Sequence, residues 1–454
     1  MTITPDSMTN LLHSLFPICR SITGPGVRET LEKVREVVPL DIKSYESGKT
    51  VFDWQIPKEW SVKDAWIKNS DGTKLIDFKI NNVHLMSYST PIHKMMTWNE
   101  LSSHIFYLET LPAAIPYRTS YYNENWGFCV SYDQLTRLLG HDKYEVFIDS
   151  DLKNGTLDFG ELLIPGKTSD EILISTYLCH PSLANDNLSG VVTTAFLAKL
   201  LLERNNQLSY RIIWVPETIG AIAYSYHNLD KVKNALAGLI VTCCGGPGLY
   251  GYKQSFDLSH PLNKIVESVF SHNQISNAIT YPFDIHGSDE RQYSSPGIGL
   301  NCVTISRDKY YEYDYYHTSL DNLDFVSGES LYESLGLYLD LTNMLDQRRK
   351  ELVEYRAHKR KQRKTNSKNS DSVFERIEPH GELMLSKHDL YPKVGGALLP
   401  NSNCEEELNL ILKTLFHLDG INSVKEIAEK LNVPKRIIQQ LLKLFLEKNI
   451  IKPA

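Results

Sequence analysis

The sequence predicts an α/β fold together with a β-rich module and a C-terminal helical unit. Strand-like and helical segments alternate between residues 136 and 350, which indicates a largely parallel sheet covered by helices. Short strand-like segments separated by turn residues fill residues 41–135, and the tail holds helices joined by a tight turn. With 454 residues, the chain is longer than a single core supports, so we expect two or three domains.

The composition is that of an ordinary folded protein. Hydrophobic residues make up 42% and charged residues 23% of the chain. The net charge of −7 argues against a protein that coats nucleic acid. Residues 1–16 lack a secretory signal and no apolar run approaches the ~20 residues that span a bilayer, so we expect a cytoplasmic protein without a membrane partner.

The seven cysteines, without a CxxC pair, favour reduced thiols over a disulfide framework. We expect the adjacent Cys243 and Cys244 to be small buried residues, because free cysteine packs as a small hydrophobe. A thiolate metal site is the less favoured alternative.

The chain begins with helical spacing over residues 8–37, interrupted at Gly24-Pro25-Gly26. From about Leu40 the pattern becomes strand and turn, and we predict a β-rich module that ends near residue 135. Its expected strands are residues 50–56, 65–68, 75–80 and 84–89.

The α/β part follows. Its expected strands are residues 144–148, 158–164, 172–177, 210–215 and 239–242, with an amphipathic helix over 188–203. Parallel sheets of this kind place ligand sites just beyond the carboxyl ends of their strands. We therefore look for chemistry where each strand ends.

The tail begins with a basic stretch. Residues 351–372 are predicted to extend a helix and then to form a solvated basic linker, with a nucleic-acid-binding arm as the alternative. Residues 373–454 are predicted to form a winged-helix or helix-turn-helix domain with helices over 405–417, 423–431 and 434–448. The positive residues of this domain could contact phosphates, or they could form the solvent-exposed face of a domain that packs on the rest of the protein. They are Lys435, Arg436, Lys443 and Lys448.

Polar residues that suit zinc follow the strands. An apolar strand ends at His180, and a short polar loop then carries Asp186. Imidazole and carboxylate are ligands that zinc prefers in tetrahedral sites. Glu217 follows the next strand and suits general acid–base work beside a metal-activated water. His317 closes an aromatic cluster and could complete the coordination sphere.

These residues resemble the ordered motifs of the co-catalytic zinc aminopeptidase superfamily, which includes the zinc glutaminyl cyclases. The motifs are His180, Asp186-Asn-Leu-Ser-Gly190, Pro216-Glu217-x-x-Gly220, Gly287-Ser288-Asp289 and Tyr316-His317-Thr followed by Asp321. The resemblance covers about residues 136–345. It implies that His180, Asp186 and His317 are metal ligands and that Glu217 is the base.

The whole chain more closely resembles a bacterial family of aminopeptidase-like proteins that is associated with polysaccharide biosynthesis. The stretches that carry this match are residues 115–128, 287–292 and 316–325. The resemblance implies a phosphorylase/aminopeptidase-like mixed sheet with helices on both faces, formed by residues 1–40 and 136–350. It also implies that residues 41–135 form an inserted β-domain and that residues 373–454 form a winged helix.

Three positions depart from the two-metal pattern. Thr218 stands where the superfamily has a ligand glutamate, Cys243 lies where another aspartate is expected, and Ser182 replaces an acidic residue. A threonine hydroxyl lacks the charge and donor strength of a carboxylate. We therefore expect one zinc ion, held by two histidines and one aspartate with an open position for water.

The loop at Asp289 and Arg291 is the least familiar part of the motif set. Asp289 could complete a second metal site or bind a substrate amine, and Arg291 could bind a carboxylate through its planar guanidinium. A surface ion pair is the alternative. His286 is expected to be a bystander.

The sequence thus predicts a zinc-dependent aminopeptidase-like hydrolase in which Glu217 activates a metal-bound water. The expected substrate is a small peptide, an amino-acid amide or an acyl-amino sugar. A degenerate peptidase fold that acts as a binding or regulatory module, and glutaminyl-cyclase-like acyl transfer, are the alternatives. Nucleic acid bound through the winged helix and a homo-oligomer stay open as partners.

Overall fold

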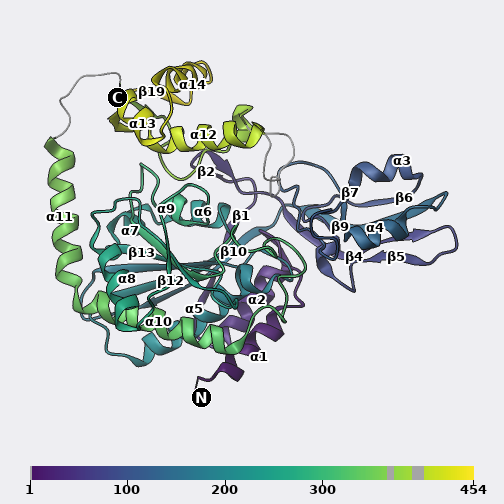
Figure 1. Ribbon diagram of the computed structural model, residues 1–454, viewed down its shortest axis with the longest axis horizontal. Coiled ribbons are helices and arrows are strands. Elements are labelled where there is room, and N and C mark those ends of the chain that lie inside the picture. Colours follow the sequence, from purple (N-terminus) through teal and green to yellow (C-terminus); the bar gives the residue numbers. More distant parts are fainter. Residues whose placement is uncertain (1–2, 366–372, 391–402) are drawn as a thin grey trace.

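The computed structural model describes residues 3–365, 373–390 and 403–454. These residues form three parts: a large α/β domain, an elongated β-rich insertion at one side and a C-terminal helical unit (Figure 1). The end of the predicted basic linker, residues 366–372, lies outside the described residues.

The α/β domain is built on an eight-stranded mixed sheet of order β1-β10-β12-β11-β13-β16-β14-β15. Four neighbouring strands, β12, β11, β13 and β16, run parallel, and antiparallel pairs flank them. The strands are β1 (Asp41–Glu46), β10 (Thr156–Ile164), β11 (Glu171–Tyr177), β12 (Ser209–Val215), β13 (Ala237–Val241), β14 (Tyr250–Lys253), β15 (Ile279–Tyr281) and β16 (Cys302–Arg307).

Helices cover both faces of this sheet, as predicted. Alternate residues of the central strands point to opposite faces, so Ile174 and Leu239 pack on one side and Leu173 and Ile240 on the other. The first face carries α1 (Pro5–Leu15), α2 (Pro25–Arg35), α5 (Gly190–Glu203), α8 (Pro261–His272) and α10 (Gly328–Gln347). The second carries α6 (Ile219–His227), α7 (Leu229–Asn234) and α9 (Glu290–Tyr293).

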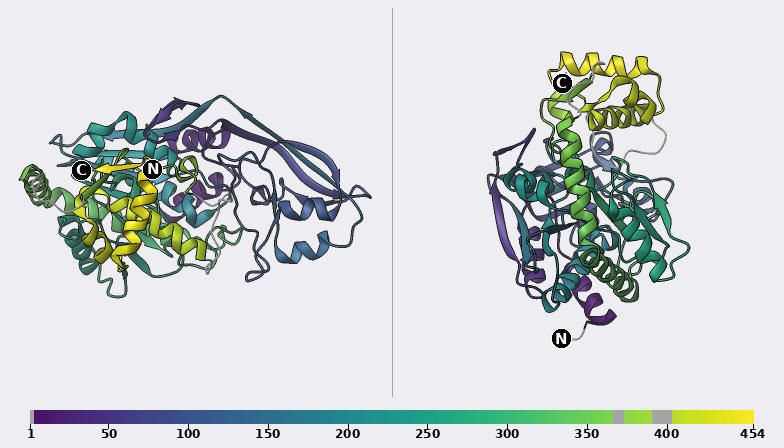
Figure 2. Two further views of the ribbon diagram at one scale, coloured as in Figure 1. Left: turned by 90° about the horizontal axis from the view of Figure 1, so that it is seen from above. Right: turned by 90° about the vertical axis from the view of Figure 1, so that its left-hand side faces the viewer.

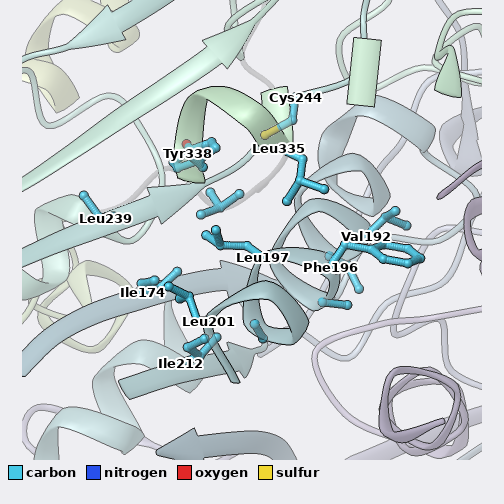
Figure 3. Close-up of a cluster of buried hydrophobic side chains, with 14 of the residues drawn as sticks. Ile174, Val192, Phe196, Leu197, Leu201, Ile212, Leu239, Cys244, Leu335 and Tyr338 are labelled. Carbon is cyan, nitrogen blue, oxygen red and sulfur yellow. The ribbon is translucent and has the colours of Figure 1, made fainter. Parts of the chain in front are cut away.

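Helix α5 lies at the centre of the larger core. Its buried residues Val192, Phe196, Leu197 and Leu201 pack between the sheet and α10 (Figure 3). Residues 190–198 are all buried, so the first part of α5 is enclosed on every side, whereas Leu202 and Glu203 at its end are exposed. The start of α5 is thereby fixed next to the strand ends.

The insertion contains a separate four-stranded antiparallel sheet of order β5-β4-β9-β6. Its strands are β4 (Glu59–Asn69), β5 (Lys74–Asp77), β6 (Ile92–Met96) and β9 (Tyr144–Lys153). Shorter elements complete it: β2 (Thr50–Val51), β3 (Trp54–Gln55), η1 (Asn82–His84), α3 (Trp98–Leu101), η2 (Ser102–His104), β7 (Ile105–Phe106), β8 (Phe128–Cys129) and α4 (Tyr132–Leu138).

Two strands belong to sheets other than those predicted. Residues 144–148 were expected in the α/β domain, but β9 pairs with β4 and β6, so the boundary at residue 135 divides the insertion. Conversely, β1 pairs with β10 in the large sheet, although residues 41–46 were assigned to the insertion. Alternation along a strand shows which residues are buried but not which sheet the strand joins. The strand expected at residues 84–89 does not form.

The C-terminal part begins with α11 (Arg349–Thr365), which runs along the α/β domain toward the end that carries the last unit (Figure 2). That unit has a three-stranded sheet, β18 (Asp419–Ser423), β17 (Val373–Arg376) and β19 (Ile451–Pro453), with η4 (Leu385–His388), α12 (Asn403–His417), α13 (Val424–Lys430) and α14 (Lys435–Glu447). Ser423 and Glu426 form the predicted capping box. The winged-helix assignment itself stays a prediction.

No helix among the described residues is long and apolar enough to cross a membrane. All six cysteines whose side chains are described are free thiols.

Candidate metal centre and active site

His180 and Asp186 lie at the carboxyl end of β11, next to the start of α5. The strand ends at Tyr177, and the kinked segment η3 (Ala184–Ser189), whose backbone is non-helical at Asp186, carries that residue into the interior. Asp186 is fully buried and His180 nearly so. Asp186 therefore needs strong partners, because an isolated buried carboxylate is very unfavourable.

His317 reaches the same point from the long loop that follows β16. A segment of the insertion pairs with this loop: the Tyr117 N–H donates to the His317 carbonyl over 2.8 Å, and Ser319 exchanges hydrogen bonds with Ile115. The imidazole of His317 is stacked on Tyr316, and the edge of Tyr117 faces it. The insertion thus helps to hold a predicted ligand in place.

The three predicted ligands converge. His180 Nε2 lies 3.8 Å and His317 Nε2 3.0 Å from Asp186 Oδ2, and one ligand atom of each residue falls within 4.8 Å of the others. Asp186 Oδ2 and His317 Nε2 are buried, and apart from these contacts within the cluster they have no hydrogen-bond partner among the described residues. Buried polar atoms are normally satisfied, so these two atoms point to an ion between them. The donor set fits zinc.

The protonation states of the ligands also suit a metal. Burial lowers the pKa of His180 to about 4, which leaves its imidazole neutral at pH 7 with a free lone pair. Burial alone would raise the pKa of Asp186, but the two imidazoles and the Tyr177 hydroxyl lower it below its ordinary value. Asp186 is therefore an anion at neutral pH.

A second layer of residues holds the ligands, and most of it was not predicted. Asp186 Oδ1 accepts a hydrogen bond from Tyr177, and its backbone N–H donates to Asp321 over 2.9 Å. The fully buried Arg20 donates to the carbonyls of His180, Pro181 and Leu15 over 2.7–2.8 Å. Such contacts fix ligand orientation. Asp321 belongs to a quoted motif, whereas nothing in the local sequence marks Arg20.

Glu217 follows β12 and lies beside the ligands without joining them. Its Oε2 is 3.9 Å from His180 Nε2, and its side chain is 26% exposed. Burial, Asp289 and Asp186 raise its pKa well above the ordinary value, while Arg291 opposes this rise. A partly open carboxylate with a raised pKa next to a metal site suits a base that exchanges protons with substrate.

Asp289 and Arg291 lie in the same neighbourhood but are less open than predicted. Asp289 is fully buried, accepts a hydrogen bond from the Thr218 N–H over 2.8 Å, and has its pKa raised by burial to about 7. Arg291 is 21% exposed and forms an ion pair with Glu382. The alternative prediction of an ion pair is therefore confirmed for Arg291. Its partner, Glu382, belongs to the C-terminal unit.

The intervening Glu290 anchors the loop. Its carboxylate forms a buried ion pair with Lys253 over 2.6 Å and accepts a hydrogen bond from Tyr310. Lys253 also donates to the carbonyls of Asp284 and His286, so the loop is held along its length. His286 lies outside the candidate metal clusters of the described residues.

The positions that depart from the two-metal pattern add no carboxylate. Cys243 and Cys244 are buried as expected, and burial raises the pKa of both thiols, which disfavours thiolate ligands. Ser182 is used structurally: its hydroxyl donates to the Phe16 carbonyl. A second cluster, Cys179, His180 and Glu217, contains a thiol whose pKa burial also raises. The first cluster is the better zinc site.

An eight-stranded mixed sheet with helices on both faces and a His-Asp-His cluster at its strand ends defines the class of aminopeptidase-like α/β proteins. Two solved peptidase structures share this fold. One is a zinc aminopeptidase of Bacillus subtilis, 12% identical, with a TM-score of 0.55 over 74% of this chain and 93% of that one. The other is a peptidase M28 precursor of Shewanella amazonensis, 11% identical, with a TM-score of 0.52 over 74% of this chain and 92% of that one.

Closer relatives span the whole chain. A Clostridium acetobutylicum protein named "putative polysaccharide biosynthesis protein with aminopeptidase-like domain" is 42% identical over 95% of this chain and 92% of its own length. The crystal structure of a "putative peptidase" from C. acetobutylicum is 39% identical, with a TM-score of 0.73 over 99% of this chain and 96% of that one.

Residues 9–348 match a family described as a domain of unknown function (DUF4910). The chain belongs to this family of aminopeptidase-like proteins.

Proposed function

We propose that this protein is a mono-zinc hydrolase that cleaves an amide or peptide bond of a small substrate. The observation that carries the proposal is the convergence of His180, Asp186 and His317. Two buried atoms there that could bind a metal, Asp186 Oδ2 and His317 Nε2, lack a hydrogen-bond partner among the described residues. The fold shared with zinc aminopeptidases supports it. Asp186, His180 and His317 would hold the ion, and zinc bound there would polarise the scissile carbonyl and acidify a water.

The protein's own residues account for the proton transfers. Glu217 accepts a proton from the attacking water and returns it to the leaving amine. Without a metal the pKa of Glu217 is raised well above its ordinary value. Zinc would lower that pKa through its charge, so that Glu217 is ionised when water binds. Asp289 accepts a hydrogen bond from the Thr218 N–H and lies close enough to Glu217 to raise its pKa. The charge of Asp289 therefore influences the base.

Substrate recognition falls to Arg291 in this proposal. Its guanidinium lies near enough to Glu217 to oppose the rise of that pKa, and it is partly exposed. It would bind a carboxylate of the substrate next to the scissile bond. The name of the C. acetobutylicum relative makes an acyl-amino sugar the second substrate class, because the same amide chemistry would serve it.

Metal analysis tests the proposal. We expect about one zinc per chain after reconstitution, and a content near zero in His180→Ala because only two of the three protein ligands remain. Tyr107→Phe, a change in an exposed tyrosine, is the control. Substoichiometric zinc in the wild type with the same content in His180→Ala would overturn the proposal.

A further inference from the structure

A segment of the C-terminal unit lies against the candidate site. Residues 377–390, called the strap below, follow β17 and contact both the α/β domain and the insertion. The strap was not part of any motif in the sequence, and nothing in the proposed mechanism uses it. Its contacts are dense enough to give it a defined position.

One side of the strap is tied to the insertion through the hairpin of β2 and β3. Asp53 in this hairpin is buried, and its carboxylate forms hydrogen bonds with three groups of the strap. They are Lys387 Nζ and the Met384 N–H, both over 2.8 Å, and His388 Nε2 over 2.9 Å. The neighbouring Trp54 Nε1 donates to the Glu382 carbonyl over 2.7 Å. Because a buried carboxylate with three partners is strongly bound, Asp53 fixes the strap to the insertion.

The other side of the strap is tied to the α/β domain around α9. The Gly381 N–H donates to Ser295 Oγ, and the Glu382 N–H donates to Gln292 Oε1, both over 2.8 Å. Gly381 has a φ of +63°, a conformation that favours glycine, and brings the strap close to Ile222 of α6. The backbone of Glu382 is therefore held at both its N–H and its carbonyl.

The side chain of Glu382 points from this fixed backbone to Arg291. Its Oε2 lies 3.1 Å from Arg291 Nε and accepts a hydrogen bond from Gln292 over 3.2 Å. Arg291 Nη1 donates to the Ile285 carbonyl over 3.1 Å. Nη1 is thus hydrogen-bonded, and Nε is ion-paired with Glu382 without forming a hydrogen bond, whereas Nη2 has neither kind of contact with any residue that the structure describes.

We propose that Glu382 is a positioning residue that holds Arg291 in place to bind a carboxylate of the substrate. This inference rests on the proposed function and adds that the strap is part of the substrate-binding machinery. Glu382 engages one corner of the guanidinium, so the free Nη2 corner remains for the ligand. The site then selects substrates with a carboxylate next to the scissile amide, such as unblocked small peptides.

A competing interpretation is that Glu382 occupies Arg291 in place of a substrate and inhibits the site. The contacts favour positioning. A side chain that substrate displaces needs freedom to leave, whereas the Glu382 backbone is tied at two points and its carboxylate is shared with Gln292. The two interpretations predict opposite effects of removing the charge.

The test uses the full-length, zinc-reconstituted protein with two substrates, a dipeptide and the same dipeptide with a C-terminal amide. We expect Glu382→Gln to raise KM for the dipeptide about tenfold with kcat within twofold, and to leave the amide substrate unchanged. Glu378→Gln is the matched control, because Glu378 lies in the strap but pairs with His380. It should change neither substrate.

A binding experiment separates this inference from the proposed function. Calorimetry on metal-free protein compares N-acetylalanine with N-acetylalaninamide, and we expect N-acetylalanine to bind wild type about tenfold tighter than Glu382→Gln. If this holds while no dipeptide is hydrolysed, the proposed function fails and the inference stands. Equal affinities in the two proteins, tighter binding by Glu382→Gln, or no binding of N-acetylalanine to wild type would overturn the inference.

Discussion

Asp186 is the residue on which the candidate site depends most. It is fully buried, its Oδ1 accepts the Tyr177 hydroxyl, and its Oδ2 faces both histidines without a hydrogen bond. The two oxygens therefore have separate roles, since one fixes the orientation of the carboxylate and the other is free for an ion. This division is typical of metal ligands supported by a second layer of contacts.

At the residue scale, we expect Glu217→Gln to retain zinc and to lose turnover. An amide side chain cannot accept the proton of water, so we expect activity to fall by roughly 10²-fold to 10⁴-fold. The measurement is the hydrolysis rate of an amide substrate, together with zinc content. Near wild-type turnover by a zinc-loaded Glu217→Gln protein would show that Glu217 is not the base and would favour a different mechanism.

The sequence predicted the residues that meet at the site but not those that support them. His180, Asp186, His317 and Glu217 follow strand ends in an order that a known superfamily shares, and all four lie together. Arg20 and Glu382 reach the site from other parts of the chain. Long-range partners of this kind leave no local pattern, because only the fold decides which backbone carbonyl or side chain they meet.

At the element scale, the helices and central strands were predictable because their apolar residues repeat with a clear period. The partner of each outer strand was not. Strand β9 alternates buried and partly buried residues along most of its length, as a strand of either sheet would, and only its pairing with β4 places it in the insertion. Strand β1 has no fully buried residue, and only its pairing with β10 places it at the edge of the large sheet.

Helix α8 provides a test of pH-dependent stability. His260 is its N-cap residue: Nδ1 accepts the Leu262 N–H, and burial lowers the pKa of His260 to about 4. In the unfolded chain histidine binds a proton below a pH of about 6.5, whereas the folded protein resists this until about pH 4. Stability from this group is therefore complete above pH 6.5 and falls as the pH drops toward 4.

We expect His260→Asn to keep a capping acceptor and to remove this dependence. Between pH 4 and 6.5 the free energy of unfolding of the wild type should rise with pH more steeply than that of the variant, by up to about 1.4 kcal/mol per pH unit. Urea unfolding at several pH values measures both slopes. Parallel slopes would contradict the assignment.

At the scale of the whole molecule, the C-terminal unit is coupled to the other two parts. It contacts the insertion through Asp53 and the α/β domain through α9. Figure 1 shows this unit at the end of the α/β domain opposite to α1. A role of the unit in the chemistry of the site is therefore a simpler proposal than a separate binding function.

We accordingly predict weak binding to DNA. Two of the basic residues considered for phosphate contacts are paired with acids: Lys443 with Glu447 and Lys448 with Asp389. Fluorescence anisotropy with a defined duplex at about 0.15 M salt should give a Kd in the micromolar range or weaker, as for non-specific binding. A nanomolar, strongly salt-dependent complex would instead assign a nucleic-acid partner to this unit.

The central claim is that a single zinc ion is bound by His180, Asp186 and His317. The most direct test is an anomalous-scattering map at the zinc edge from crystals of the reconstituted protein. We expect one strong peak within bonding distance of His180 Nε2, Asp186 Oδ2 and His317 Nε2, with Glu217 beside it and outside the coordination sphere. Two peaks, a peak bound by Cys179 or Cys243, or no peak would contradict it.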